Sequence, residues 1–173
     1  MKRNGLKYTA NALLALLLGA GGVAAQDLVF SMQATDACVA DSGHEGNAEP
    51  CIGESANLCM ERTDGGQSTA GMVACMGAEL EAWDQLLNAA YTKLMAREKV
   101  EDKEMAELES SVPKQAPALQ DMQRKWMAYR DARCDYIGAQ WGGGSGTGPA
   151  VQGCHMVMTG KQALFLQRML ADY

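Results

Sequence analysis

Histidine and closely spaced cysteine pairs are scarce in this sequence, and their scarcity argues against a metal site. The 173 residues contain two histidines, His44 and His155, and the six cysteines form no C-x-x-C pair. Zinc sites usually draw on close pairs of cysteine or histidine. We therefore expect neither a metal ion nor another cofactor.

Basic charge is also in short supply. The chain carries 15 Lys and Arg against 21 Asp and Glu, a formal net charge of −6. Nucleic-acid binding relies on clusters of Lys and Arg that neutralise phosphates, so this class of partner is excluded. An acidic surface favours encounter with a basic partner, although it serves solubility equally well.

Motifs of the common enzyme classes are missing too. No serine stands in a nucleophile-elbow context, and residues 160–162 (Gly-Lys-Gln) lack the Ser or Thr that a phosphate loop requires. Glu79, Glu81 and Asp84 could in principle supply paired carboxylates for acid–base chemistry, but such residues are more often solvated on a helix. We expect a protein that is not an enzyme.

A long hydrophobic run occurs once, at the N-terminus. It follows three basic residues, Lys2, Arg3 and Lys7. Residues 10–20 are apolar, and residues 23–25 (Val-Ala-Ala) offer the small side chains that a signal peptidase needs, which predicts a signal peptide over 1–25 and cleavage before Gln26. The alternative is a membrane anchor, but the run is shorter than the roughly 20 residues that span a bilayer. No cysteine near the cut would carry a lipid.

Cleavage would remove three basic and no acidic residues, leaving 148 residues with 12 basic and 21 acidic side chains, a formal charge of −9. This length suits one domain. We divide it into a cysteine-rich N-terminal segment (26–66) and a helical domain (67–173). The expected location is periplasmic or secreted, with no membrane anchor after cleavage.

All six cysteines lie in the mature part, and an even count in an exported chain predicts three disulfides. They would also consume Cys154, which next to His155 could otherwise be read as a nucleophile. Cys134 and Cys154 should pair, because one lies late in an expected helix and the other opens the next. The preferred set is completed by Cys59–Cys75 and Cys38–Cys51, and its main alternative is Cys51–Cys59 with Cys38–Cys75.

Helical periodicity dominates the rest of the chain. Short helical turns are expected over 34–40 and 52–60, and a long helix should begin at a cap, Ser68 or Thr69. Residues spaced by three and four form its inner stripe: Met72, Cys75, Glu79, Leu80, Trp83, Leu87, Tyr91 and Leu94. The charged stretch 97–111 is either a solvated extension of this helix or a flexible link.

A second long helix should start near Pro117, since proline fits the first helical turn, and end at Gly142–Gly144. Its stripe is Leu119, Met122, Trp126, Tyr129, Arg133, Ile137 and Trp141. A final helix is expected over 154–171, with core residues Met158, Phe165, Met169 and Leu170. The fold class is therefore all-α: a small disulfide-stabilised helical bundle with two long antiparallel helices and a C-terminal helix. The main core should contain Leu80, Trp83, Leu87, Leu94, Trp126, Tyr129 and Ile137.

Two features could carry a structural or binding role. If the long helices are antiparallel, Arg130 could face Asp84 near Asn88, with Tyr91 and Trp126 packed over the pair, and so fix the helix register. The Gly-rich loop 142–149 is either a plain connection or a contact surface for a partner. Its candidate contact residues are Gly143, Gly144, Ser145, Gly146 and Thr147.

The motif residues resemble a known family. Residues 84–91 read D-x-x-L-N-x-x-Y and residues 123–134 read Q-R-x-W-x-x-Y-R-D-x-x-C, after Cys75 and Glu79. This order is similar to that of the LprI-like lysozyme-inhibitor domain family, over about residues 51–170. The resemblance implies an exported α-helical domain and inhibition of lysozyme, and it names no inhibitory residue.

Two function classes follow. The first is an exported binding protein that inhibits a lysozyme-type peptidoglycan hydrolase, whose basic charge would complement the mature chain. The alternative is an interaction or structural module of the envelope without inhibitory activity.

Overall fold

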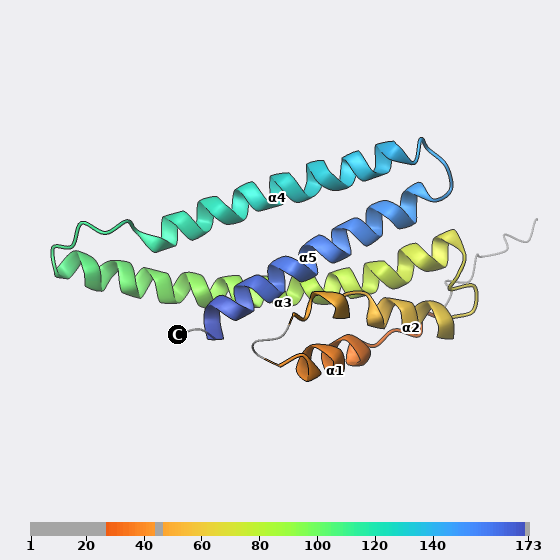
Figure 1. The fold of residues 1–173 in the computed structure, drawn as a ribbon, viewed down its shortest axis with the longest axis horizontal. Helices are drawn as coiled ribbons and strands as arrows, with labels where there is room; N and C mark the ends of the chain where they lie inside the picture. The colour runs from red at the N-terminus through yellow and green to blue at the C-terminus, as the bar shows by residue number, and fades with distance from the viewer. Residues whose placement is uncertain (1–26, 44–46, 172–173) are drawn as a thin grey trace, which may run out of the picture.

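The computed structural model describes residues 27–43 and 47–171, in which every regular element is a helix. In chain order these are α1 (Gln33–Asp41), the short 3-10 helix η1 (Glu49–Cys51), α2 (Glu54–Arg62), α3 (Thr69–Glu107), α4 (Gln115–Gln140) and α5 (Thr147–Ala171). The long helices α3 and α4 run antiparallel, α5 lies along both, α2 packs on the N-terminal half of α3, and α1 packs on α2 (Figure 1). The expected all-α bundle is confirmed. The signal peptide expected over 1–25 lies outside the described residues.

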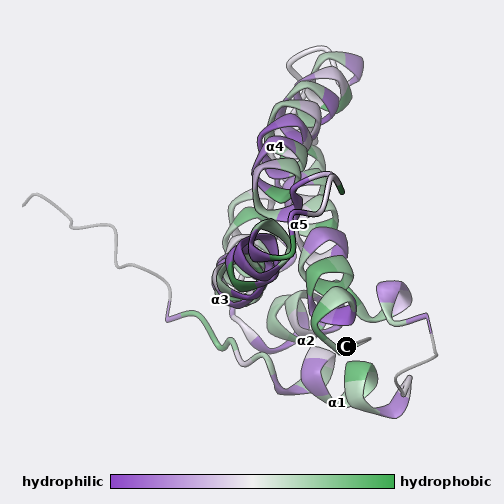
Figure 2. Ribbon diagram, turned by 90° about the vertical axis from the view of Figure 1, so that its left-hand side faces the viewer, coloured by the Kyte–Doolittle hydropathy of each residue, from purple (hydrophilic) through white to green (hydrophobic). Residues whose placement is uncertain are grey.

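Helix α3 runs the length of the bundle. Its cap is Ser68, whose Oγ accepts a hydrogen bond from the backbone N–H of Gly71 at 3.1 Å. The helix continues to Glu107, so most of the charged stretch 97–111 extends the helix rather than linking it flexibly, and Figure 2 shows this end as hydrophilic. The fully inward positions recur every three or four residues: Cys75, Glu79, Trp83, Leu87, Ala90, Leu94 and Glu98. Leu80 is half-buried and packs against the same core.

Helix α5 fills the space between α3 and α4. Its buried residues are Met156, Met158, Thr159, Gly160, Gln162, Ala163, Leu164 and Leu166. A Cβ on Gly160 would lie about 2.9 Å from Ile52 Cδ1, so glycine is needed where the η1–α2 connection crosses the helix. Met169 and Leu170 are half-buried against the core, as expected, but Phe165 is 42% exposed and its expected core position is wrong. It lies on the side of α5 that no other helix covers.

The start of α5 also differs from expectation. The helix begins at Thr147, seven residues before Cys154. Gly148 and Gly153 have low helix propensity and made this stretch resemble a loop. Pro149 occupies the third helical position, where its missing N–H costs no hydrogen bond. Tertiary packing on α3 and α4 therefore decides the local structure.

Helix α4 starts at Gln115, two residues before Pro117, and the cap comes from another helix. Lys114 at the N-cap position makes no side-chain cap. Instead, the carboxylate of Asp102 on α3 accepts hydrogen bonds from the backbone N–H groups of Gln115 at 2.6 Å and Ala116 at 3.0 Å. This contact joins the C-terminal part of α3 to the beginning of α4.

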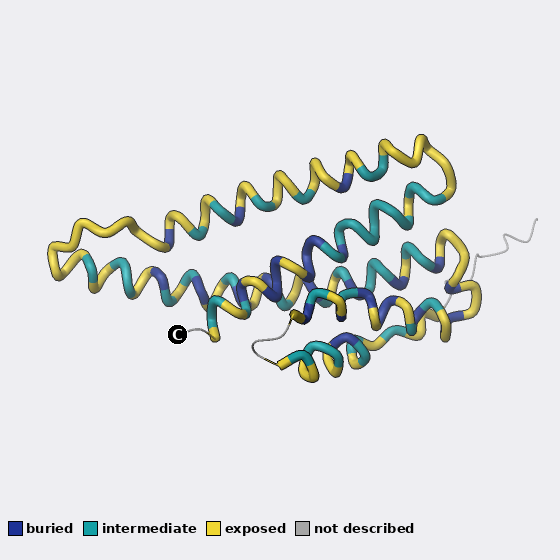
Figure 3. The backbone as a smooth tube through the Cα atoms, in the orientation of Figure 1, coloured by how far each residue is buried: buried dark blue, intermediate teal, exposed yellow. Residues whose placement is uncertain are grey.

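Only a narrow strip of α4 is buried, and most of the helix is exposed or intermediate (Figure 3). Trp126 is half-buried and packs against the core, and Ile137 is half-buried. Tyr129 is 58% exposed and Trp141 is 54% exposed, so their expected inward positions are wrong. The apolar stripe read from the sequence is wider than the strip that α5 and α3 can cover, and these two aromatic side chains fall outside it.

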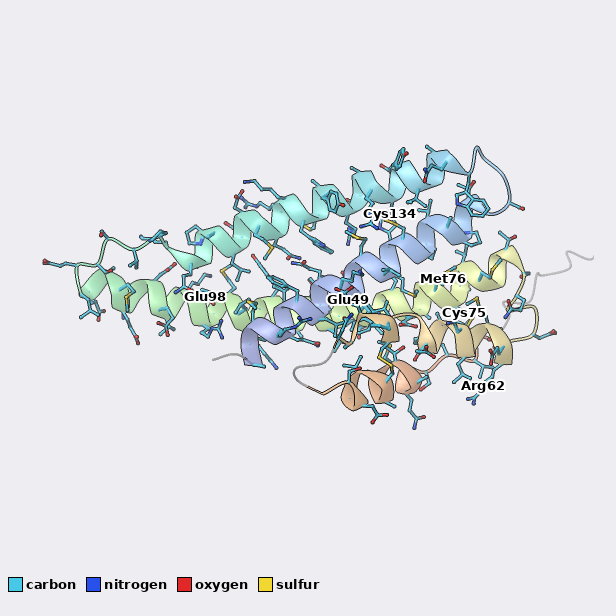
Figure 4. The ribbon with its side chains drawn as sticks, in the orientation of Figure 1. Glu49, Arg62, Cys75, Met76, Glu98 and Cys134 are labelled. Carbon is cyan, nitrogen blue, oxygen red and sulfur yellow. A yellow bond between two sulfur atoms is a disulfide. The ribbon has the colours of Figure 1, made fainter. Side chains whose placement is uncertain are left out.

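Three disulfides link neighbouring elements and match the preferred pairing. Cys38–Cys51 joins α1 to η1, Cys59–Cys75 joins α2 to α3, and Cys134–Cys154 joins α4 to α5. Figure 4 shows Cys75 where α2 meets α3 and Cys134 on the side of α4 that faces α5. Each bond connects helices that also pack together, so the covalent links reinforce the packing.

We predict that Asp102→Ala lowers the free energy of unfolding by about 1–2 kcal/mol, the usual cost of losing a helix N-cap. The matched control is Asp121→Ala, which removes an exposed carboxylate paired with Lys125 on α4 and should change stability by no more than about 0.5 kcal/mol. Urea unfolding followed by circular dichroism measures both. Equal losses for the two variants would show that Asp102 is not a cap.

Candidate functional site

The most constrained polar group in the described part of the chain is the carboxylate of Glu79. Its side chain is fully buried. Oε1 accepts hydrogen bonds from the backbone N–H of Gly53 at 2.7 Å, from Thr35 Oγ1 at 3.1 Å and from Trp83 Nε1 at 3.0 Å. Oε2 accepts one from the backbone N–H of Ala56 at 2.7 Å. The acid is thus satisfied by donors from α1, from the start of α2 and from α3 itself.

The local conformation of α2 explains why a carboxylate fits there. Gly53 is the N-cap of α2 and has a φ of +107°, a value that glycine adopts readily. Its N–H and that of Ala56, the third helical residue, have no partner inside the helix. The carboxylate of Glu79 binds both, at the end where the helix dipole favours negative charge.

Helix α1 is held by a second pair of hydrogen bonds. The backbone N–H of Thr35 donates to Ser55 Oγ, and the backbone N–H of Ser55 donates to Thr35 Oγ1, each at 3.0 Å. The Thr35 hydroxyl, which accepts here, also donates to Glu79. Residues 27–43 and 47–66, which we call the N-terminal unit, are therefore fixed to α3 by one continuous polar network.

Sequence reasoning placed Glu79 in an acidic cluster with Glu81 and Asp84, and the structure separates the three. Glu79 is buried, whereas Glu81 and Asp84 are exposed. Its position in the sequence could have indicated that Glu79 is buried, because it stands midway between Cys75 and Trp83 in the inner stripe of the helix. A carboxylate at such a position needs buried hydrogen-bond donors. Three of the four donors, from Thr35, Gly53 and Ala56, lie over 20 residues away along the chain, outside any local motif.

The N-terminal unit is strongly acidic. It contains seven acidic residues and one basic residue, Arg62. Six of the acids are exposed: Asp27, Asp36, Asp41, Glu54, Glu61 and Asp64. Glu49 forms an ion pair with Lys161 of α5. The network around Glu79 and two disulfides thus present a compact acidic surface to the solvent.

The expected ion pair between Asp84 and Arg130 is not formed, which corrects the sequence-based expectation. Asp84 accepts a hydrogen bond from Asn88 Nδ2 at 2.8 Å, one helical turn away. Arg130 pairs with Asp131 at 2.9 Å and lies 5.1 Å from the centre of the Trp126 ring. The reason is α5, which lies along both long helices, so the faces carrying these two side chains do not meet (Figure 1).

The Gly-rich connection contains the five expected contact residues. Gly143, Gly144 and Ser145 are exposed in the turn between α4 and α5, whereas Gly146 and Thr147 are half-buried. Gly142 and Gly143 have positive φ, and the Trp141 ring lies so close to Gly146 that a Cβ would overlap it. The exposed part is thus shorter than the expected loop 142–149.

Neither a metal cluster nor a membrane span is found within 27–43 and 47–171. No group of three or more His, Cys, Asp or Glu in these ranges could hold a metal ion. No helix in the same ranges is long and apolar enough to cross a bilayer.

These features define a class: an all-helical, disulfide-linked domain in which a buried carboxylate fixes an acidic N-terminal unit to three long helices. Residues 59–166 match the family model described as lysozyme inhibitor LprI, and the chain belongs to this family. It is also 30% identical over 96 residues to an uncharacterized protein of Rhizobium meliloti (strain 1021), an alignment that covers 56% of this chain and 69% of that protein. No solved structure matches it.

We predict that Glu79→Gln destabilises the protein by about 3 kcal/mol, because the amide nitrogen would face a backbone N–H and leave donors unpaired. The control is Glu81→Gln on the exposed side of the same helix, which should stay within about 0.5 kcal/mol of the parent. Denaturant unfolding under non-reducing conditions measures both. A loss below about 1 kcal/mol for Glu79→Gln would contradict a structural role for this charge.

Proposed function

We propose that the mature protein binds a lysozyme-type peptidoglycan hydrolase outside the cytoplasm and inhibits it without cleaving a substrate. The observation that carries this proposal is membership of the LprI family over residues 59–166, which extend from the end of α2 through most of α5. Three disulfides are typical of proteins in oxidising compartments such as the periplasm, where these hydrolases act.

The acidic charge of this protein also supports a lysozyme as the partner. Lysozymes are basic, and the exposed acids of the N-terminal unit give this protein a strongly negative side. Long-range attraction between opposite charges raises the rate of encounter and orients the two proteins before contact. The acidic N-terminal unit would therefore mainly raise the rate of association with the enzyme.

Rigidity supports binding as well. Cys38–Cys51 and Cys59–Cys75 limit the freedom of the N-terminal unit, and the four hydrogen bonds to Glu79 fix its orientation. A surface that is already ordered loses little conformational entropy on binding. The turn at Gly143–Ser145 lies at the same end of the bundle as the α2–α3 connection, so both candidate contact surfaces are near that end (Figure 1).

The direct test is to titrate the purified mature protein into a turbidity assay with several basic lysozymes and to measure binding by calorimetry. The proposal requires stoichiometric binding together with loss of lytic activity. If micromolar protein leaves every enzyme fully active and calorimetry shows no heat of binding, the proposal is wrong, and the non-inhibitory envelope module takes its place.

We predict that association depends on the acidic unit in a salt-sensitive way. The variant Asp41→Asn/Glu61→Gln/Asp64→Asn removes three exposed acids from the N-terminal unit, outside any helix N-terminus. Its association rate with a basic lysozyme should fall several-fold at low salt. The difference should shrink above about 0.15 M salt, where the Debye length is near 8 Å.

The matched control changes the net charge equally at the other end of the molecule. Glu104→Gln/Glu107→Gln/Glu109→Gln removes three exposed acids around the C-terminal end of α3 (Figure 1). Stopped-flow or surface-based kinetics should show a smaller effect for this variant. Equal effects would mean that net charge, rather than the acidic N-terminal unit, governs the encounter.

A further inference from the structure

A groove of about 290 Å³ lies between α4 and α5, on the half of α4 that leads to the Gly-rich turn. Helix α4 contributes Arg133 and Ile137, and α5 contributes small and apolar residues between Ala150 and Met158. Cys154, which lines the groove, is disulfide-bonded to Cys134 of α4, so the two walls are fixed relative to each other. The groove is therefore open and apolar, with one charged side chain.

The charged side chain in the lining of this groove is basic, whereas the molecule as a whole is acidic. Arg133 is the sole charged residue that lines it, and within the described chain no acid lies in ion-pair distance of this guanidinium. The α5 wall contains no Asp, Glu, Lys or Arg between residues 147 and 160. By contrast, neighbouring Arg130 is already paired with Asp131. Arg133 is thus the guanidinium on this surface that is available to bind an external carboxylate.

Exposed aromatic side chains surround Arg133. Tyr129 precedes it by four residues and Tyr136 follows it by three, so both lie beside it on the helix surface. They are 58% and 64% exposed, and Trp141, 54% exposed, follows at the end of α4. Tyr, Trp and Arg are the residue types that carry most of the binding energy at protein interfaces. We call Tyr129, Arg133, Tyr136 and the adjoining groove the Arg133 face.

We propose that the Arg133 face is the inhibitory contact and that it docks on the carboxylate-lined glycan cleft of the hydrolase. This rests on the proposed function. Enzymes that cleave glycosidic bonds hold two carboxylates at the scissile bond, and a guanidinium can bind a carboxylate through two parallel hydrogen bonds. Arg133 would occupy this position, and the tyrosines would supply contact area beside it.

The overall charge of the protein favours the cleft of a basic enzyme over a small free anion as the partner of Arg133. The mature protein, with 12 basic and 21 acidic side chains and a formal charge of −9, repels free anions at long range. It attracts a basic enzyme, however, and the carboxylates of that enzyme are then brought to the Arg133 face by the attraction between the two proteins. A partner that is basic as a whole and acidic in its cleft complements both the negative net charge of this protein and the positive charge of Arg133.

The test compares Arg133→Gln with Arg124→Gln. Arg124 is also exposed on α4 but lies nine residues earlier, about two and a half turns away, and therefore on the opposite side of the helix. Both variants change the net charge equally. We expect Arg133→Gln to weaken binding to a basic lysozyme by at least about 30-fold, mainly through faster dissociation, and Arg124→Gln to leave it within about twofold. Circular dichroism and unfolding of each variant check that both are folded.

Two further measurements locate the contact. Arg133→Lys keeps the charge but not the two-pronged geometry, so its affinity should be intermediate. An oligosaccharide of N-acetylglucosamine that occupies the glycan cleft should compete with the wild-type protein. Tyr136→Ser, at an exposed position, should weaken binding without affecting the fold.

The outcomes separate the two proposals. If the wild-type protein inhibits but Arg133→Gln inhibits equally well and the oligosaccharide does not compete, the Arg133 face is not the contact, and the proposed function stands. If the wild-type protein neither binds nor inhibits, both proposals are overturned. Loss of inhibition in Arg133→Gln, with competition by the oligosaccharide, supports both.

Discussion

The buried carboxylate of Glu79 is the interaction on which the N-terminal third of the molecule depends. Helices α1 and α2 have nine residues each, a length at which isolated helices are marginal in water. Their packing on α3 places an acid where it loses its hydration, and this cost is offset because four donors converge on the two oxygens. The disulfides reduce the entropy lost when these segments come together, whereas the carboxylate determines how they are oriented. Covalent links and a directional polar contact therefore have separate roles.

This arrangement permits an unusual distribution of charge. The N-terminal unit keeps seven acids and one arginine on short helices and the segments beside them, although like charges so close together repel each other. Packing alone would hold such a unit weakly, since it buries few large apolar side chains. The two disulfides and the Glu79 network compensate for the repulsion, and the acids remain in solvent. Helices α4 and α5 together carry six basic residues against three acids, and Arg133 among them has no ion-pair partner within the described residues.

Features that depend on interactions between residues close in the sequence could be predicted from the sequence, whereas features that depend on tertiary contacts could not. The course of α3 and its Ser68 cap follow from local periodicity and capping, and the disulfide pairing agrees with cysteine spacing between neighbouring helices. The start of α5 was misplaced because its Gly- and Pro-containing first turns are stabilised by tertiary contacts that propensity does not include. The Asp84–Arg130 pair assumed that α3 and α4 face each other there, and the position of α5 excludes this. Two of the four donors to Glu79 are backbone N–H groups of a distant segment, which no residue pattern records.

The acidic N-terminal unit and the Arg133 face lie on opposite sides of the bundle. This separation bears on how inhibition would work. Figure 2 places α4 and the pair α1–α2 on opposite sides of α3 and α5. Direct contact between one enzyme and both surfaces would require the enzyme to reach around the bundle. Electrostatic attraction does not need contact, because it acts over about a Debye length and changes the rate of encounter. A buried hydrogen-bonded charge pair instead acts on dissociation, once water has been excluded. In the proposed complex, the acidic unit would draw in a basic enzyme while the Arg133 face would hold it, and the rigid three-helix core between them would keep the two contributions independent.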